Sequence, residues 1–231
     1  MNLFYQPAIP RGVHALDEDE SWHAVKVLRM QVGDVLLLTD GAGCFYKARI
    51  TNTASRTCTF EITDTIAQQP RNYRITLAVA PTKNADRMEW LVEKATEVGV
   101  EEIHFMRCQN SERKTLNTER LVKIAVSAMK QSGQCVLPAI YPIKPFAEIV
   151  ALQADQKFIG YVNSTNSHLL KYAAQPAKSY LVLIGPEGDF RPDELKVALQ
   201  NGFGMISLGS NRLRTETAAL VACQTLNFVN L

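Results

Sequence analysis

Two patterns of hydrophobic and polar positions divide the chain near residue 70. The first part contains apolar-rich runs of strand length, separated by polar turns with glycine, at residues 35–39, 44–51 and 57–63. A short amphipathic stretch, residues 22–30, precedes these runs and predicts a helix. Because short strands at this spacing are typical of small barrels, we expect a β-barrel domain over residues 1–70.

After residue 70, apolar runs alternate with stretches of helical periodicity. Five runs have the length and composition of buried strands: residues 74–80, 101–108, 157–162, 181–184 and 204–208. Predicted helices lie between or after them, at residues 84–98, from Asn117, at residues 145–152, from Pro192 and from Thr215. Such alternation is typical of a parallel sheet with helices on both faces, so we expect an α/β domain over residues 71–231.

The last two strand runs each end in a loop of small and polar residues. The run at 181–184 stops at Gly-Pro-Glu-Gly (residues 185–188), and the run at 204–208 is followed by the loop 209–214. Thr215 then has the side chain of an N-cap for the final helix. We expect the two strands to be neighbours, with both loops at the edge of the sheet where ligands of parallel sheets bind.

The residues of these loops restrict the class of ligand. Glu187 and Asp189 disfavour a phosphate group, and neither loop follows the P-loop or the Gly-x-Gly-x-x-Gly order. The small residues let backbone amides and carbonyls approach a flat group with polar edges, and Leu183, Leu208 and Leu213 offer apolar contact to its faces. The alternative interpretation is that both loops are ordinary turns, because isolated Gly-Pro and Leu-Gly pairs are common in turns.

Composition limits the partners and the location of the protein. The 231 residues carry 25 Lys and Arg against 23 Asp and Glu, so a net charge of +2 gives no general attraction to nucleic acid, and an RNA site has to be local. Five cysteines without a Cys-x-x-Cys pair indicate reduced thiols. No run has the length of a membrane span or of a signal-peptide core, so we expect a soluble cytoplasmic protein without a membrane partner.

The sequence gives no support for metal or hydrolase chemistry. His14, His23, His104 and His168 have no partner at metal-ligand spacing, so we expect no metal site. The chain also contains no Gly-x-Ser-x-Gly elbow, and scattered Ser, His and Asp residues occur in any chain of this length.

The segments IGPEG (residues 184–188) and LGSNRLRTETA (residues 208–218) together resemble the carboxyl-terminal signature of the SPOUT RNA methyltransferases. The pair is most similar to the family that methylates the imide nitrogen of a uridine in small-subunit (16S) ribosomal RNA. Residues 23–34 and 39–50 are similar to the PUA-like domain of that family, and EKATEVGV (residues 93–100) is similar to another of its segments. The resemblance implies a PUA-like RNA-binding domain followed by a SPOUT trefoil-knot domain, bound S-adenosylmethionine, a homodimer, and ribosomal RNA within the small subunit as partner.

The reaction that the resemblance implies requires positive charge at the uracil and at the RNA backbone. Arg214, or Arg11 from either subunit, would supply a positive charge that favours the uracil anion, and Arg11, Lys26 and Arg29 would contact the RNA backbone. Alternatively, Arg214 packs or pairs with Glu216, and the basic residues of the first domain are solvated surface charges. Family members hold the cofactor with residues that correspond here to Leu183, Ile184, Gly185, Glu187, Gly188, Leu208, Gly209, Leu213, Arg214, Thr215, Glu216 and Ala218.

Two positions depart from the family pattern. The family usually reads GPEGG, and this chain has Asp189 in place of the last glycine of that motif. The family also usually has arginine at the position of Gln134. Asp189 adds a carboxylate beside the cofactor turn and puts the backbone conformation of that turn in question. It is also the best evidence for the alternative function, a non-catalytic RNA-binding protein with a degenerate methyltransferase fold.

Overall fold

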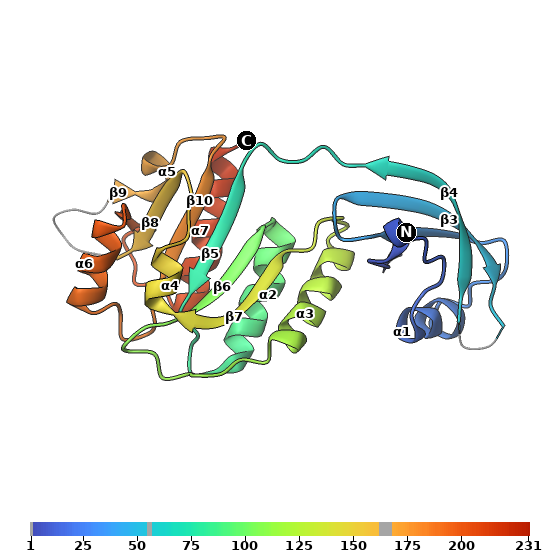
Figure 1. Ribbon diagram of the computed structural model, residues 1–231, viewed down its shortest axis with the longest axis horizontal. Coiled ribbons are helices and arrows are strands. Elements are labelled where there is room, and N and C mark those ends of the chain that lie inside the picture. Colours follow the sequence, from blue (N-terminus) through green and yellow to red (C-terminus); the bar gives the residue numbers. More distant parts are fainter. Residues whose placement is uncertain (1, 55–56, 162–167) are drawn as a thin grey trace. The chain divides into compact units, whose positions relative to one another are not determined.

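The computed structural model describes residues 2–54, 57–161 and 168–231, which form two compact units (Figure 1). The first unit consists of Met1–Pro70 with Val126–Leu137, and the second of Arg71–Ala125 with Pro138–Leu231. Helix α3 (Thr118–Gln131) therefore begins in the second unit and contributes its last turns to the first, where Lys130 forms an ion pair with Glu20.

A mixed four-stranded sheet forms the first unit, in the order β1-β2-β3-β4. The short strand β1 is parallel to β2, whereas β2, β3 and β4 pair in antiparallel fashion. Phe4, Leu36, Leu38 and Ile50 are buried in its core. The β-rich fold is confirmed, but β1 was not predicted because three residues carry too little periodicity. The strands are β1 (Leu3–Tyr5), β2 (Val35–Thr39), β3 (Cys44–Asn52) and β4 (Thr59–Ala67).

The helix of the first unit begins earlier than the sequence predicts. A 3₁₀ turn, η1 (Ile9–Arg11), is followed by helix α1 (Glu18–Trp22) and a π-helical turn, η2 (His23–Val27). Asp17 is the N-cap, because its side chain accepts a hydrogen bond from the amide of Glu20 at 2.8 Å. The acidic run after Asp17 therefore belongs to the first helical turn, where carboxylates are stabilised by the helix dipole, and not to a loop.

A seven-stranded sheet forms the second unit, in the order β7-β6-β5-β10-β8-β11-β9, and all of its pairings are parallel. The predicted α/β sheet is confirmed with its five strands, although Val162, the predicted end of one strand, lies outside the described residues. Two edge strands, β7 and β9, were not predicted, because β7 contains two prolines and β9 has two residues. The strands are β5 (Arg74–Val79), β6 (Glu102–Arg107), β7 (Ala139–Pro145), β8 (Gln156–Gly160), β9 (His168–Leu169), β10 (Ser179–Ile184) and β11 (Gly204–Ser207).

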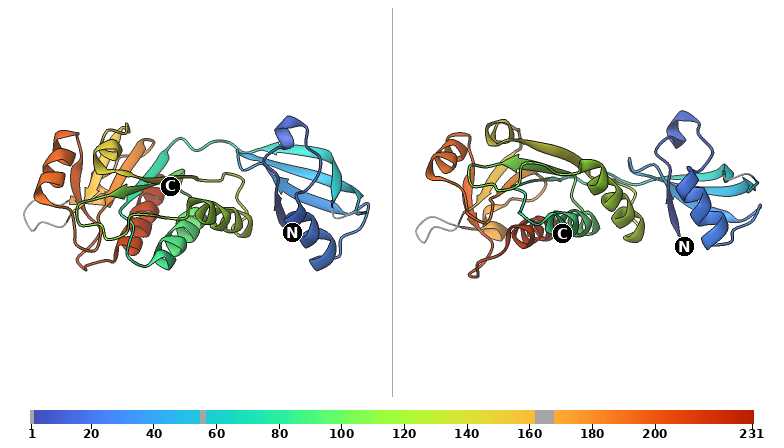
Figure 2. Two further views of the ribbon diagram at one scale, coloured as in Figure 1. Left: turned by 60° about the horizontal axis from the view of Figure 1, so that its bottom comes forward. Right: turned by 90° about the horizontal axis from the view of Figure 1, so that it is seen from below.

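Helices cover both faces of this sheet, as expected for such a sequence (Figure 2). Helices α2 and α7 pack against each other on one face, and α4 and α6 lie on the other. Leu181 and Leu183 of β10 join the apolar cluster beneath α4 and α6. The helices of this unit, apart from α3, are α2 (Ala85–Val98), α4 (Phe146–Val150), α5 (Leu170–Ala173), α6 (Pro192–Gln200) and α7 (Thr215–Val229).

Asn227 ties helix α7 to two other parts of the second unit. The residue is only 7% exposed, and its Oδ1 accepts hydrogen bonds from the Tyr73 hydroxyl at 2.8 Å and from Arg71 Nη1 at 3.2 Å. Its Nδ2 donates to the carbonyls of Val98 and Gly99, both at 3.1 Å. One amide group therefore joins α7 to the end of α2 and to the segment before β5.

Replacing Asn227 with alanine is expected to lower the free energy of unfolding by about 2 kcal/mol, because several buried donors and acceptors lose their partner together. Urea denaturation followed by circular dichroism measures this change. Asn201→Ala is the matched control, since Asn201 is exposed and its side chain donates to the Val197 carbonyl. We expect this substitution to change the free energy of unfolding by at most about 0.5 kcal/mol. Equal effects of the two substitutions would contradict the assigned role of Asn227.

Candidate functional site

The two glycine-containing loops lie at the same end of the second sheet. Strands β10 and β11 both pair in parallel with β8, so the loops after them emerge on either side of its last residue, Gly160. The prediction of a common edge is confirmed. The prediction that the two strands are neighbours is wrong, because β8 lies between them. Strand order is set by packing over the whole sheet, and local sequence does not encode it.

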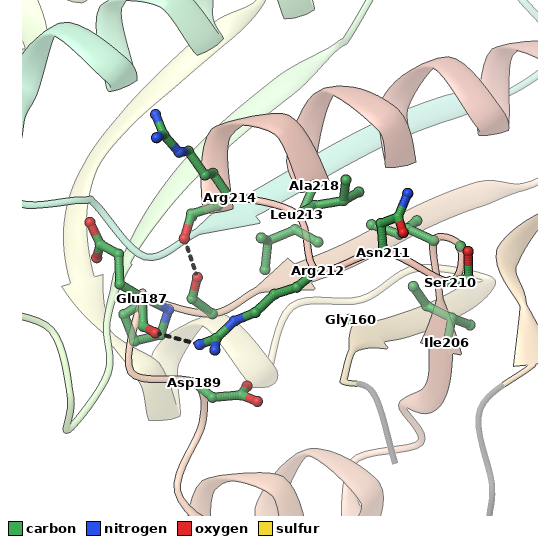
Figure 3. A pocket seen from close by; sticks show the side chains of 16 residues that line it. Gly160, Glu187, Asp189, Ile206, Ser210, Asn211, Arg212, Leu213, Arg214 and Ala218 are labelled. Atoms are coloured by element: carbon green, nitrogen blue, oxygen red, sulfur yellow. Dashed lines mark hydrogen bonds between the residues drawn. The ribbon is translucent and has the colours of Figure 1, made fainter. Parts of the chain in front are cut away.

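A cavity of about 690 Å³ lies between these loops (Figure 3). The predicted residues that line it are Ile184, Gly185, Glu187, Leu208, Gly209, Leu213, Arg214, Thr215 and Ala218. The lining residues that the prediction did not include are Gly160, Pro186, Asp189, Ile206, Ser210, Asn211 and Arg212. Gly160 and Ile206 belong to β8 and β11, so they could be recognised only once the strand order was known.

Three predicted residues lie behind the cavity wall. The side chain of Leu183 is fully buried in the core under α4 and α6. Gly188 faces the side chain of Asn110, since a Cβ at position 188 would lie 3.2 Å from Asn110 Cβ. Glu216 is 6% exposed, and its Oε1 lies 3.7 Å from Nε of Arg87 on α2. These residues can support the loops, but they do not line the cavity.

The turn after β10 keeps a tight conformation despite Asp189. The amide of Asp189 donates to the Pro186 carbonyl at 2.9 Å, and Asp189 has a φ of +61°. Its Oδ1 accepts a hydrogen bond from the amide of Phe190 at 2.8 Å. Aspartate is among the residues that tolerate this left-handed conformation, in part because its side chain can bond to the local backbone. The substitution therefore retains a conformation in which glycine is usual.

Two hydrogen bonds reach the first loop, one from the start of α7 and one from the second loop (Figure 3). Thr215 Oγ1 donates to the Gly185 carbonyl at 3.0 Å, and Arg212 Nη2 donates to the Glu187 carbonyl at 3.4 Å. Thr215 was predicted to be the N-cap of the last helix, but the N-cap is Arg214 and Thr215 is the first helical residue. The prediction failed because the Thr215 hydroxyl bonds to the neighbouring loop instead of capping its own helix.

Arg214 is exposed at the mouth of the cavity. Its guanidinium points away from the apolar side chains of Leu213 and Ala218 (Figure 3). The alternative pairing of Arg214 with Glu216 is not observed among the described residues, and Glu216 Oε1 lies near Nε of Arg87 instead. In the described part of the chain, no ion pair involves Arg214, so its charge is available to a ligand.

The basic residues predicted for RNA binding lie in the first unit. Arg11 ends η1, Lys26 belongs to η2, and Arg29 follows that turn with a φ of +56°. All three side chains are exposed, and the described residues form no ion pair with them. They are therefore open to solvent on the first unit.

The described residues give no indication of a metal site or of a membrane-spanning helix. Over residues 2–54, 57–161 and 168–231, no three His, Cys, Asp or Glu side chains are grouped so that they could hold a metal ion. No described helix is long and apolar enough to cross a membrane. The five cysteines are all free thiols.

Comparison with known protein families identifies both parts of the chain. Residues 69–227 match the model of an RNA methyltransferase domain, and residues 16–63 match that of an RNA methyltransferase PUA domain. The first match covers both loops and the cavity, and the second covers most of the four-stranded sheet.

Curated relatives and solved structures are similar to this chain over nearly its full length. Ribosomal RNA small subunit methyltransferase E of Rickettsia conorii is 30% identical to this chain, over 90% of this chain and 86% of its own length. The enzyme of the same name from Buchnera aphidicola is 31% identical, over 90% of this chain and 85% of its own length. A probable rRNA-methyltransferase from Porphyromonas gingivalis superposes with a TM-score of 0.92 at 42% identity, covering 100% of this chain and 98% of its own. The structure of ribosomal RNA small subunit methyltransferase E from Neisseria gonorrhoeae, bound to S-adenosyl methionine, superposes with a TM-score of 0.87 at 26% identity, again covering 100% of this chain and 98% of its own. This chain therefore belongs to the RNA methyltransferase family, in the group of ribosomal RNA small subunit methyltransferase E.

Proposed function

We propose that this protein is a cytoplasmic enzyme that transfers a methyl group from S-adenosylmethionine to the imide nitrogen of a uridine in 16S ribosomal RNA. The observation that carries the proposal is the cavity at the carboxyl ends of β8, β10 and β11. Its walls are the two loops that carry the family signature. The cofactor named for the structure from Neisseria gonorrhoeae and the substrate named for the relatives support the same reaction.

The cavity fits S-adenosylmethionine in size and chemistry. Its volume of about 690 Å³ lies within the usual range of small-molecule sites. Leu208, Leu213 and Ala218 offer apolar contact to the faces of an adenine ring. The space beside Gly209 is open, since no described atom outside residues 208–210 lies within 4 Å of a Cβ placed there. Glu187 and Asp189 add negative charge that suits a cationic ligand.

The chemistry requires positioning and charge from the protein. When bound, S-adenosylmethionine supplies an activated methyl group on a positively charged sulfonium. The chain has to hold the uracil imide in line with that methyl group and favour loss of the imide proton. We assign this second role to Arg214, whose positive charge would stabilise the uracil anion, with Arg11 of either subunit as the alternative source of the charge.

RNA binding is assigned to the PUA-like domain over residues 1–70, through Arg11, Lys26 and Arg29, and catalysis to the domain over residues 71–231. We further propose that the catalytic domain carries a trefoil knot, as in the SPOUT family, and that the protein is a homodimer. Phe228 of α7 is 64% exposed, which suits contact with a second copy.

A methylation assay tests the proposed reaction. Small ribosomal subunits from a strain without this gene should gain one methyl group on one uridine when incubated with the protein and labelled S-adenosylmethionine. Mass mapping of RNA fragments would locate the group, and Arg214→Ala should reduce turnover by roughly a hundredfold while the affinity for the cofactor remains. A folded wild-type protein that binds RNA but no S-adenosylmethionine would instead support the non-catalytic alternative.

A further inference from the structure

The segment that follows β6 lies against the first loop and the start of α6. The side chain of Asn110 donates from Nδ2 to the carbonyls of Gly188 and Asp189, at 2.9 and 3.0 Å. The preceding residue, Gln109, donates from its backbone amide to Glu194 Oε1 at 2.9 Å. Strand β5 separates β6 from β10 in the sheet, so this support reaches the loop from two strands away.

Helix α6 anchors the supporting segment. Gln109 Nε2 donates to Asp193 Oδ2 at 2.6 Å, and this hydrogen bond holds the pKa of Asp193 below its ordinary value. Glu194 is 5% exposed, and its Oε2 accepts from the amide of Arg191 at 2.9 Å. Residues 109–110, the first turn of α6 and the loop after β10 therefore form one hydrogen-bonded unit.

Each backbone carbonyl from Gly185 to Asp189 has a hydrogen-bond donor within the protein. The Gly185 carbonyl accepts from Thr215 at the start of α7, and the Glu187 carbonyl accepts from Arg212 of the second loop. The Pro186 carbonyl accepts from the amide of Asp189. The last two carbonyls of the turn both depend on Asn110. These two carbonyls lie at the left-handed position of the turn, since Asp189 has a φ of +61°.

Packing gives a second reason to single out Asn110. A Cβ at Gly188 would lie 3.2 Å from Asn110 Cβ, which is closer than most such contacts. The glycine therefore leaves room for the asparagine, and the asparagine in turn covers the glycine. Asn110 does not line the cavity, so any effect it has on a ligand has to pass through the turn.

We propose that Asn110 is a positioning residue that holds the turn at residues 185–189 in the shape that binds the cofactor. This inference rests on the proposed function, in which the cavity takes S-adenosylmethionine. Without Asn110, the turn would sample other conformations, and binding would have to restore the ordered one, at a cost in affinity. Asn110 acts on binding and not on the chemical step, so turnover at saturating cofactor is unaffected.

The test compares Asn110→Ala with wild type by calorimetric titration. We expect the dissociation constants of S-adenosylmethionine and of the product S-adenosylhomocysteine to rise about tenfold each. The turnover number at saturating cofactor and the KM for RNA should stay within twofold. Asn201→Ala, which removes another exposed asparagine that donates to a carbonyl, should leave all of these constants unchanged.

Two further variants sharpen the test. Asn110→Asp keeps the shape but places a carboxylate oxygen against two carbonyls, so its loss of affinity should exceed that of alanine. Gly188→Ala should also weaken binding, because its methyl group would press on Asn110, and it provides a result even if the Asn110 variants fail to fold.

The outcomes separate this inference from the proposed function. If wild type binds S-adenosylmethionine and folded Asn110→Ala binds it equally well, the positioning role is overturned and the proposed function stands. A change in the KM for RNA with unchanged cofactor affinity would also overturn it, since Asn110 would then contact substrate. If wild type does not bind S-adenosylmethionine at all, the proposed function fails and this inference fails with it.

Discussion

Gly209→Val is expected to weaken S-adenosylmethionine binding about a hundredfold, or about 2.8 kcal/mol, while the protein stays folded. Gly209 lines the cavity and has a φ of +139°, a conformation that is essentially restricted to glycine. Among the described residues, no atom outside residues 208–210 lies within 4 Å of a Cβ at this position, so the valine would not clash with the rest of the fold. Its side chain would instead occupy ligand space, and relaxation of its backbone would displace the second loop.

Gly202→Val is the matched control for this substitution. Gly202 also has a positive φ, +84°, and a Cβ at this position would likewise meet open space, but the residue follows α6 and does not line the cavity. Both variants should therefore lose a similar part of their free energy of unfolding, whereas only Gly209→Val should lose cofactor affinity. Calorimetric titration of each variant with S-adenosylmethionine measures its affinity for the cofactor. Wild-type affinity in folded Gly209→Val would exclude this placement of the cofactor.

The features that sequence predicted best are those encoded by a few consecutive residues. The apolar run Leu181–Ile184 indicates a strand buried on both faces, and the glycine and proline that follow it mark the turn. The helix predicted at residues 84–98 is likewise observed as α2, with Asn84 as its N-cap and Gly99 as its C-cap. Helix α1 was placed too late, because its acidic first turn resembles a loop in composition.

Features that depend on distant parts of the chain could not be predicted in this way. Gly160 lines the cavity because its strand, β8, lies between the two strands whose loops form the cavity walls. Asn110 reaches Gly188 from 78 residues away in sequence. Glu216 belongs to the family signature but is buried beside Arg87 of another helix, so a signature residue need not line the cavity. In each case the three-dimensional packing, and not the local pattern, decides the role.

Replacing both Arg11 and Arg29 with alanine is expected to weaken binding to the ribosomal substrate by about tenfold or more. With a net charge of only +2, the protein has little nonspecific attraction to RNA, so a few phosphate contacts should carry much of the salt-dependent affinity. Both side chains are exposed and form no ion pair among the described residues, so the substitutions break no ion pair in that part of the chain. The slope of log affinity against log salt should therefore fall by roughly one to two units.

A double variant of the same unit separates local contacts from overall charge. Lys47→Ala with Arg49→Ala also removes two positive charges, but Lys47 pairs with Asp64 at 3.5 Å and Arg49 donates to the Gly33 carbonyl at 2.8 Å. If Arg11 and Arg29 contact phosphate, only their loss should change the salt slope and the turnover at low RNA concentration, and cofactor affinity should be the same in all variants. Equal slopes in the two double variants would mean that Arg11 and Arg29 are solvated surface charges, and that RNA is bound elsewhere on the chain.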